Sequence, residues 1–344
     1  MAQIFFSDNT VIGGGMEHRP YFVAEVNSSH NGSMDTAKRM IEAAAEAGCD
    51  CVKFQSWSSA TLYSKTYYKA NPIAKRFVDK FSMSPGQLGE LAEYCKECGV
   101  AFSSTPYSEE EVDFLAETGV PFIKIASMEI NNPAFLEYIA KKGVPMVLST
   151  GMADMEEIEA AVDVIEKTGN KNLCLLHCIS IYPPETDDIR LNNIVGLQEK
   201  FPHYPVGFSD HSTGTEMACG AVALGACLIE KHLTLDKTKI GMDNQMAMEP
   251  QELKSLVRQC RNISSAMGGK ERIVSEAEFA QRKNMRRSLI YTRDMAAGET
   301  VSEADIGVKR PGTGFAPARK NDFIGKKLLR DVRGDTLLTG EDFE

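Results

Sequence analysis

The sequence feature that most constrains the fold is an alternation of two hydrophobic periods, repeated eight times between residues 21 and 263. Each unit begins with a short run rich in β-branched residues, which predicts a strand. It continues with a longer amphipathic run rich in Ala, Glu, Lys and Leu, which predicts a helix. The expected strand–helix pairs are 21–26 with 34–48, 51–56 with 84–99, 101–106 with 108–119, 122–127 with 132–143, 145–151 with 154–169, 173–180 with 191–201, 205–210 with 213–226, and 227–234 with 249–263.

These units predict an α/β protein whose strands form a parallel sheet. The strands are almost continuously apolar, as expected for strands buried on both faces. Most helical runs end at Gly, and several begin after Ser, Asp, Asn or Pro, which are common residues at those positions. Eight consecutive units predict a (β/α)₈ TIM barrel. The segment "IFFSDNTVIGGG" at 4–15 predicts a hairpin that would close the bottom of the barrel.

The alternation stops near residue 268, which predicts a domain boundary. We expect a catalytic barrel with its N-terminal hairpin at 1–268 and a polar, partly helical linker at 269–287. Residues 288–344 contain short strand-like runs broken by "AAGE" and "RPGTG". They predict a small β-rich C-terminal domain with no long helix.

Composition excludes several classes of partner. The formal net charge is −10 and no Lys/Arg-rich run occurs, so we expect neither nucleic acid nor an anionic membrane as a partner. No apolar run is long enough for a membrane-spanning helix, and the first residues lack the pattern of a secretory signal. The nine cysteines are scattered, which indicates reduced thiols and a cytoplasmic protein.

Polar residues occur at the end of every expected strand. In a TIM barrel the active site forms at the carboxyl ends of the strands, so these residues are candidates for one common site. Each taken alone could be an ordinary loop residue, but a complete ring is harder to explain in that way. The ring consists of Glu25, Lys53, Gln55, Thr105, Lys124, Ser127, Glu129, Ser149, Ser180, Tyr182, Ser209, His211, Glu230 and His232.

Two lysines in this ring interrupt apolar strands. Lys53 in "CVKFQ" and Lys124 in "FIKIAS" cannot stay charged and buried without partners. Two ammonium groups surrounded by hydroxyls suit a phosphate or a carboxylate. The alternative is a pair of internal salt bridges, with Glu25 and Glu129 as the expected partners.

Two histidines end adjacent expected strands. His211 lies in "FSDHS" and His232 in "IEKHLT", so the side chains can lie within reach of one metal ion. Two imidazoles leave open positions on a divalent ion, as in a catalytic Mn²⁺ or Mg²⁺ site. The alternatives are two hydrogen-bonded histidines without a metal, or a purely structural role. His30, in a loop at the same end, is a further candidate.

Several motifs together resemble a known family. In chain order they are "AEVNSSHNGS", "VKFQ", "FSSTPYS", "IKIASMEINN", "LSTGM", "CISIYP", "FSDHS" and "IEKHLT". Each motif is short, but their joint order is specific and resembles the sialic acid (N-acetylneuraminate, or nonulosonic acid) synthase family. "VKRPGTG" near the end resembles the antifreeze-like (SAF) domain of that family.

The resemblance implies an activity and a role for each candidate residue. The family condenses phosphoenolpyruvate with an N-acetylmannosamine-type aldose and releases phosphate. Glu25 and Glu129 would handle protons, water or sugar hydroxyls, and His211 and His232 would bind the metal. Arg310 would reach the sugar in the barrel of a second protomer, within a domain-swapped homodimer. Gln55 and Tyr182 would line the sugar pocket, and phosphoenolpyruvate would be held by Lys53, Thr105, Lys124, Ser127, Ser149, Ser180 and Ser209.

Two loops depart from the pattern of the family. Residues 241–250 read "GMDNQMAMEP" where "GPDH" followed by Ser is common, and the first loop differs at Asn27 and Ser29. Both loops border the expected sugar site, so the sugar stays open and could give a legionaminic- or pseudaminic-type product. Two other functions also stay open. One is a Schiff-base aldolase with Lys124 or Lys231 as the nucleophile, and the other is a sugar-binding protein without catalysis.

Overall fold

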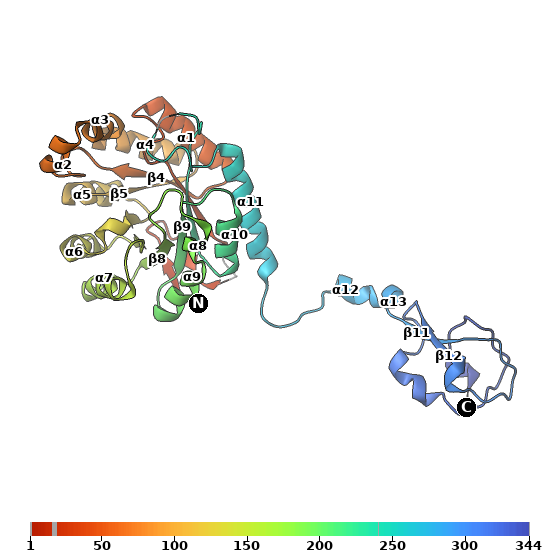
Figure 1. Cartoon of the computed structure of the whole chain (residues 1–344). Helices are drawn as coiled ribbons and strands as arrows, with labels where there is room; N and C mark the ends of the chain where they lie inside the picture. Colours follow the sequence, from red (N-terminus) through yellow and green to blue (C-terminus); the bar gives the residue numbers. More distant parts are fainter. Residues whose placement is uncertain (1, 16–18, 240, 344) are drawn as a thin grey trace. The chain divides into compact units, whose positions relative to one another are not determined.

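The computed structural model describes residues 2–15, 19–239 and 241–343. The chain divides into two compact units, Met1–Gly268 and Gly269–Glu344. In the first unit, helices surround a set of parallel strands (Figure 1). In the second, short strands and turns enclose a separate small core.

Eight parallel strands form the centre of the N-terminal unit. Their order in the sheet is β5-β4-β3-β10-β9-β8-β7-β6, so the first and last barrel strands of the chain, β3 and β10, are paired. At the two ends of this order, Ser103 in β5 donates a hydrogen bond of 2.8 Å to the carbonyl of Phe122, beside β6. The sheet is thus a nearly closed barrel, which confirms the predicted fold class. The strands are β3 (Tyr21–Glu25), β4 (Cys51–Ser56), β5 (Ala101–Pro106), β6 (Ile123–Ile125), β7 (Met146–Ser149), β8 (Leu173–Cys178), β9 (Val206–Asp210) and β10 (Leu228–His232).

Amphipathic helices cover the outside of the barrel. The first of them, α1 (Met34–Ala47), is capped at both ends. The Ser33 side chain accepts a hydrogen bond from the Thr36 amide, and Gly48 ends the helix at φ 87°, a left-handed conformation. Apolar residues on the inner faces of these helices pack against the strands and form the main core. The helices are α1 (Met34–Ala47), α4 (Pro85–Glu97), α5 (Glu109–Thr118), α6 (Pro133–Lys141), α7 (Met155–Lys167), α9 (Asn192–Lys200), α10 (Glu216–Ala223) and α11 (Pro250–Met267).

An N-terminal hairpin closes the amino end of the barrel. Strands β1 (Gln3–Phe5) and β2 (Val11–Gly13) pair antiparallel. Ile4, Phe6 and Ile12 are buried in one cluster with Tyr21 and Leu228, which are the first residues of β3 and β10. Because apolar side chains fill this end, the opposite, carboxyl end of the strands is left for a site.

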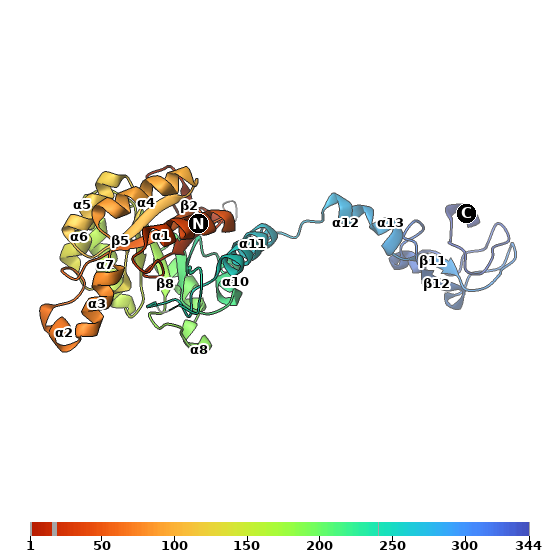
Figure 2. The same ribbon diagram turned by 90° about the horizontal axis from the view of Figure 1, so that it is seen from above.

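The segment between β4 and α4 contains helices that the sequence pattern did not predict. It holds α2 (Lys65–Ala70) and α3 (Pro72–Phe81), where we expected a long loop. Ser64 caps α2, and Pro72 is the first residue of α3. Both helices project from one side of the unit (Figure 2). A third missed helix, α8 (Thr186–Ile189), lies elsewhere in the barrel and is a single turn.

The C-terminal unit is small and rich in turns. Its first residues form α12 (Glu276–Ala280) and α13 (Arg282–Met285), and β11 (Ser288–Tyr291) then pairs antiparallel with β12 (Ile306–Lys309). Leu289, Tyr291 and Phe323 lie in its core. Short 3₁₀ turns complete it at Glu303–Asp305, Pro317–Asp322 and Gly340–Asp342. Across the described parts of the chain, no helix is both long enough and apolar enough to cross a membrane.

Candidate active site

A cavity of about 350 Å³ lies at the carboxyl ends of the barrel strands. Most of the predicted ring of polar residues meets there, although its members are far apart in the chain. The cavity is lined by Glu25, Lys53, Gln55, Thr105, Lys124, Ser127, Ser149, Ser180, Tyr182, Ser209, His211, Glu230 and His232.

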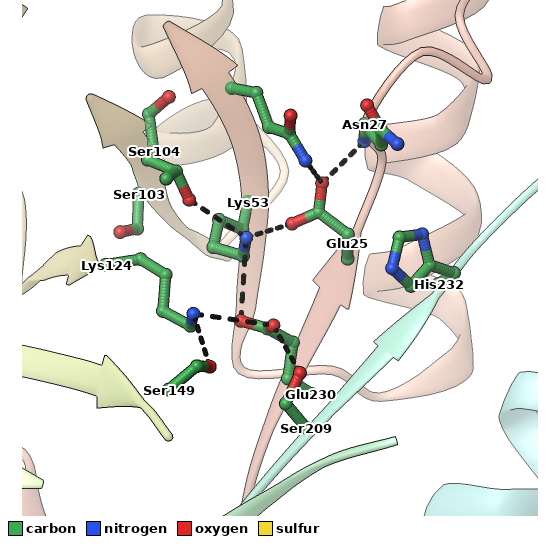
Figure 3. Close-up of polar contacts among 12 residues, drawn as sticks. Glu25, Asn27, Lys53, Ser103, Ser104, Lys124, Ser149, Ser209, Glu230 and His232 are labelled. Carbon is green, nitrogen blue, oxygen red and sulfur yellow. Dashed lines mark hydrogen bonds and ion pairs between the residues drawn. The ribbon is translucent and has the colours of Figure 1, made fainter. Parts of the chain in front are cut away.

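Two lysines and two carboxylates form a buried charged group at the base of the cavity (Figure 3). Lys53 Nζ forms an ion pair with Glu25 Oε2 and lies 3.6 Å from Glu230 Oε2. Lys124 Nζ lies 3.9 Å from Glu230 Oε1. Glu230 therefore lies between the two ammonium groups. Of the two partners named in the salt-bridge alternative, Glu25 belongs to this group, whereas Glu230 is present instead of Glu129.

Hydroxyl groups complete the surroundings of both ammonium groups. Lys53 donates to Thr105 Oγ1 at 3.1 Å, and Lys124 donates to Ser149 Oγ at 2.7 Å. Ser209 Oγ donates to Glu230 Oε1 at 2.9 Å. The lysines thus share a wall with neutral donors that can also turn toward an anion in the cavity.

Burial and charge shift the pKa values of this group in different directions. Burial raises the pKa of Glu25 and lowers the pKa of Lys124. Burial alone would also lower the pKa of Lys53, but the Glu230 and Glu25 carboxylates outweigh it and raise that pKa overall. Burial likewise opposes ionisation of Glu230, yet Lys124 and Lys53 hold its pKa below the usual value. The shifts favour the charged forms of Lys53 and Glu230, and they make Glu25 the carboxyl of this group that holds a proton more readily.

Both oxygens of Glu25 are oriented by neighbours. Oε1 accepts from the Asn27 backbone amide at 2.8 Å and from Gln55 Nε2 at 3.2 Å, while Oε2 pairs with Lys53. Gln55 is itself fixed, because Trp57 Nε1 donates to its Oε1 at 2.7 Å. This carboxyl is thus held in one orientation at the cavity wall.

The two predicted histidines lie side by side. The ring centroids of His211 and His232 are 5.3 Å apart, and Tyr182 lies over His211 with a centroid distance of 4.2 Å. His211 Nδ1 lies 2.8 Å from the Ile179 carbonyl, so that nitrogen carries a proton. Burial opposes ionisation of this ring, but Cys178 and the Ile179 carbonyl raise its pKa overall. Burial lowers the pKa of His232 well below its usual value, which keeps this imidazole neutral.

This donor set fits a loosely held divalent ion. No group of three or more His, Cys, Asp or Glu among the described residues is arranged to hold a metal. Imidazole nitrogens are nevertheless the kind of ligand that such an ion takes, and the bond from His211 Nδ1 to the Ile179 carbonyl orients one of the two rings. Two protein ligands would leave open positions for water and substrate.

Two residues near the histidines were missed as site residues, although the sequence marked their loops as unusual. Asp243 Oδ2 lies 3.7 Å from His232 Nδ1 and contacts the Asn27 side-chain amide. Both residues line the cavity. Three methionines also line it, with exposed fractions of 52% for Met128, 72% for Met152 and 50% for Met242. The signals that could have indicated their role were the position of Asn27 just after β3 and the unusual loop that holds Asp243.

Three other candidates in the barrel unit do not line the cavity. Glu129 ends the 3₁₀ turn Ser127–Glu129, and its Oε2 accepts from Asn132 Nδ2 at 2.9 Å. His30 is buried, and its Nδ1 accepts from the Gly32 amide at 3.0 Å. Lys231 is buried and paired with Asp210 at 2.7 Å, so it is not available as a Schiff-base nucleophile in this cavity. Arg310 follows β12 in the C-terminal unit and is exposed.

Comparisons with known proteins identify the family. Residues 40–272 match the NeuB family, and residues 286–344 match the SAF domain. An N,N'-diacetyllegionaminic acid synthase from Campylobacter jejuni is 39% identical over 92% of this chain and 98% of that protein. A protein of the same name from Legionella pneumophila is 36% identical over 94% of both chains.

A solved structure gives the same result. The N-acetylneuraminic acid synthetase of Leptospira borgpetersenii, in complex with citrate, aligns with a TM-score of 0.75 and 34% identity. The alignment covers 82% of this chain and 95% of that one. The chain therefore belongs to the NeuB family and ends in a SAF domain, which confirms the resemblance found in its motifs.

Proposed function

We propose that the protein is a nonulosonic acid synthase. It condenses phosphoenolpyruvate with an N-acetylmannosamine-type or 2,4-diacetamido hexose, consumes one water and releases phosphate. The observation that carries this proposal is the convergence of Lys53 and Lys124, from strands β4 and β6, on one cavity ringed with hydroxyls. The names of the similar legionaminic acid synthases support it.

The buried lysines account for binding of phosphoenolpyruvate. This substrate carries a phosphate and a carboxylate, so an acidic protein needs local positive charge to hold it. Lys53 and Lys124 supply two ammonium groups, and Glu230 lies between them; the Glu230 and Glu25 carboxylates raise the pKa of Lys53 against the effect of its burial and so favour its charged form. Neutral hydrogen-bond donors around the phosphate and carboxylate come from Thr105, Ser127, Ser149, Ser180 and Ser209.

The reaction needs one carbon–carbon bond and one addition of water. C3 of phosphoenolpyruvate attacks the aldehyde carbon of the open-chain sugar, and the sugar oxygen takes up a proton. Positive charge develops at C2, where water adds and loses a proton. The C2–O bond to phosphate then breaks and leaves the ketone. Glu25 accepts the proton of the water, because burial raises its pKa and it faces the cavity, whereas Glu129 does not.

His211 and His232 are the residues that would hold the divalent metal, Mn²⁺ or Mg²⁺. When bound, the ion would supply Lewis-acid polarisation of the aldehyde oxygen. The histidines, Tyr182 and Gln55 define the side of the cavity that faces the sugar. On this arrangement phosphoenolpyruvate lies toward the lysines and the sugar toward the histidines.

The mouth of the cavity favours a sugar with two acetamido groups. Met128, Met152 and Met242 present exposed apolar surface there, which suits acetyl methyl groups. Asn27 and Asp243 offer hydrogen-bond partners for amides and hydroxyls. We therefore expect a 2,4-diacetamido hexose to be the best substrate, in line with the names of the two similar synthases.

The decisive experiment is a phosphate-release assay with phosphoenolpyruvate and a panel of 2-acetamido and 2,4-diacetamido hexoses. Phosphate should appear only when both substrates are present, and the product should be a nine-carbon keto acid by mass spectrometry. If no hexose released phosphate, the proposal would fail. Trapping of Lys124 by borohydride with pyruvate would instead favour the Schiff-base aldolase, and sugar binding without turnover would favour the non-catalytic alternative.

The substitution Gly151→Ala is expected to weaken phosphoenolpyruvate binding without unfolding the barrel. A Cβ at this position would collide with Ser180 Oγ and would lie 2.8 Å from Ser127 Oγ, so both hydroxyls would have to move. We expect KM for phosphoenolpyruvate to rise about tenfold or more, which corresponds to loss of one or two hydrogen bonds. Gly89→Ala, where the added Cβ meets nothing within 4 Å, is the control and should leave KM unchanged.

We further propose that the chain works as a domain-swapped homodimer in the cytoplasm, with Arg310 completing the sugar site of the other subunit. Arg310→Ala should lower kcat/KM for the sugar, whereas the exposed Arg333→Ala should not. Deletion of residues 269–344 should leave a folded barrel without turnover, because this unit has its own core.

Mixed dimers test the swap directly. A Lys53→Met subunit has a defective barrel and an intact Arg310, and an Arg310→Ala subunit has the reverse. In a swapped dimer the mixed species contains one complete site, so random mixing should restore about a quarter of the wild-type activity. Activity no higher than that of the two separate variants would exclude the swap.

A further inference from the structure

Three buried residues that do not line the cavity lie directly behind the two histidines. Asp210 precedes His211 at the end of β9, Lys231 precedes His232 in β10, and Ser212 follows His211. Successive side chains of a strand point to opposite faces, so Asp210 and Lys231 face away from the cavity that the histidines line. Asp210 is opposite Lys231 in the register of β9 and β10.

These residues, Asp210, Ser212 and Lys231, form what we call the outer-face cluster. Lys231 Nζ lies 2.7 Å from Asp210 Oδ2 and donates to the Ser212 carbonyl at 2.6 Å. Asp210 Oδ1 accepts from the Ser212 amide at 2.8 Å and from Ser212 Oγ at 2.6 Å. Asp210 and Ser212, which flank His211, are therefore hydrogen-bonded to each other and to Lys231, which precedes His232.

Stability alone does not explain a buried charge pair at this place. Removal of a lysine and an aspartate from water costs so much free energy that a hydrophobic pair of similar volume is often as stable. Asp210 and Lys231 are 0% and 1% exposed, so this cost applies to both. A hydrophobic pair would not fix the backbone of the turn at 210–212, because hydrogen bonds are directional and apolar contacts are not.

We propose that the outer-face cluster positions His211 against His232 and thereby sets the affinity for the divalent metal. The inference rests on the metal site of the proposed function. The His211 ring itself contacts the Ile179 carbonyl, Cys178 Sγ at 4.0 Å and the Tyr182 ring, and the cluster restrains its backbone on both sides. Residues that orient metal ligands commonly change metal affinity by about 10–100-fold when they are replaced.

The test measures Mn²⁺ binding to the full-length protein by the electron paramagnetic resonance of free Mn²⁺. The double variant Asp210→Leu with Lys231→Met keeps the volume and removes all four bonds. We expect its dissociation constant for Mn²⁺ to rise about 10–100-fold, with a melting temperature within a few degrees of the wild type. Binding of phosphoenolpyruvate in the absence of metal, measured by calorimetry, should be unchanged, because Lys53 and Lys124 lie on other strands.

Two further variants keep the result interpretable. Asp210→Asn with Lys231→Met retains an acceptor for Ser212 but loses the link to β10. It should bind Mn²⁺ about tenfold more weakly than the wild type. If the first double variant does not fold, this second one tests the positioning role. Val206→Ala, at the other end of β9, should lower stability and leave Mn²⁺ affinity unchanged. Wild-type affinity in both double variants would overturn the positioning role. A wild-type protein that binds no Mn²⁺ would overturn the metal site itself.

Discussion

Replacement of Lys53 by methionine is expected to lower kcat/KM for phosphoenolpyruvate by about 10³-fold, the scale found when one preorganised charged or hydrogen-bonding group is removed from an active site. Lys53 contacts Glu25, Glu230 and Thr105 and lines the proposed anion site. Its loss removes one of two cations that hold the substrate. The measurement is steady-state phosphate release at saturating sugar and metal.

The same substitution should also reduce stability, and this effect has to be separated from catalysis. Without Lys53, two buried carboxylates face each other with Lys124 as the remaining cation, and breaking such a buried pair costs about 3–5 kcal/mol. A second change, Glu25→Gln, should recover most of that free energy of unfolding but none of the activity. Lys38→Met, which removes an exposed ion pair with Glu90, is the surface control. Full activity of Lys53→Met would rule out the proposed anion site.

The sequence was sufficient to predict the barrel and most of the cavity because both depend on simple periodicities. Eight strand–helix units define a parallel barrel, and parallel strands bring their carboxyl ends to one mouth. Any polar residue at a strand end therefore becomes a neighbour of the others, however distant in the chain. This reasoning placed Lys53, Lys124 and both histidines together without knowledge of their contacts.

The pairing of charges could not be predicted in the same way. Glu25 and Glu129 were the partners named for the two lysines in the salt-bridge alternative, on an expected strand that continued to residue 127. Strand β6 ends at Ile125, and the 3₁₀ turn Ser127–Glu129 keeps Ser127 at the cavity while Glu129 contacts Asn132 instead. Glu230 lies beside Lys124 because the strand order sets β10 opposite β6 in the barrel. No local pattern in the chain encodes this neighbourhood.

The helices between β4 and α4 were missed for a local reason. α2 and α3 are short, and Asn71–Pro72 interrupts the segment between them, so no helical period extends over enough residues to be recognised. Trp57, Tyr68, Val78 and Phe81 give this segment a small core of its own. The stabilisation is tertiary, and sequence periodicity does not register it.

Replacement of His232 by alanine is expected to lower activity as much as Lys53→Met does. The loss should arise at the sugar aldehyde and not at phosphoenolpyruvate. Removal of one of two imidazoles should abolish measurable Mn²⁺ binding. The value of kcat should fall by about 10³-fold or more, because Lewis-acid polarisation by the bound ion would lower the activation barrier by several kcal/mol. The KM for phosphoenolpyruvate should change little, since Lys53 and Lys124 are untouched.

The proposed metal role also determines how chelation and pH should act. A chelator should stop phosphate release in the wild type, and added Mn²⁺ should restore it in the wild type but not in His232→Ala. The burial that lowers the pKa of His232 keeps this ring neutral as the pH falls through the usual range of histidine. For His211, burial opposes ionisation, but Cys178 and the Ile179 carbonyl raise its pKa overall. As the pH falls, protonation of His211 should therefore weaken metal binding before protonation of His232 does. His203→Ala, outside the cavity, is the control. Full turnover of the wild type in excess chelator would contradict the metal role and leave the lysine site as the only part of the mechanism still supported.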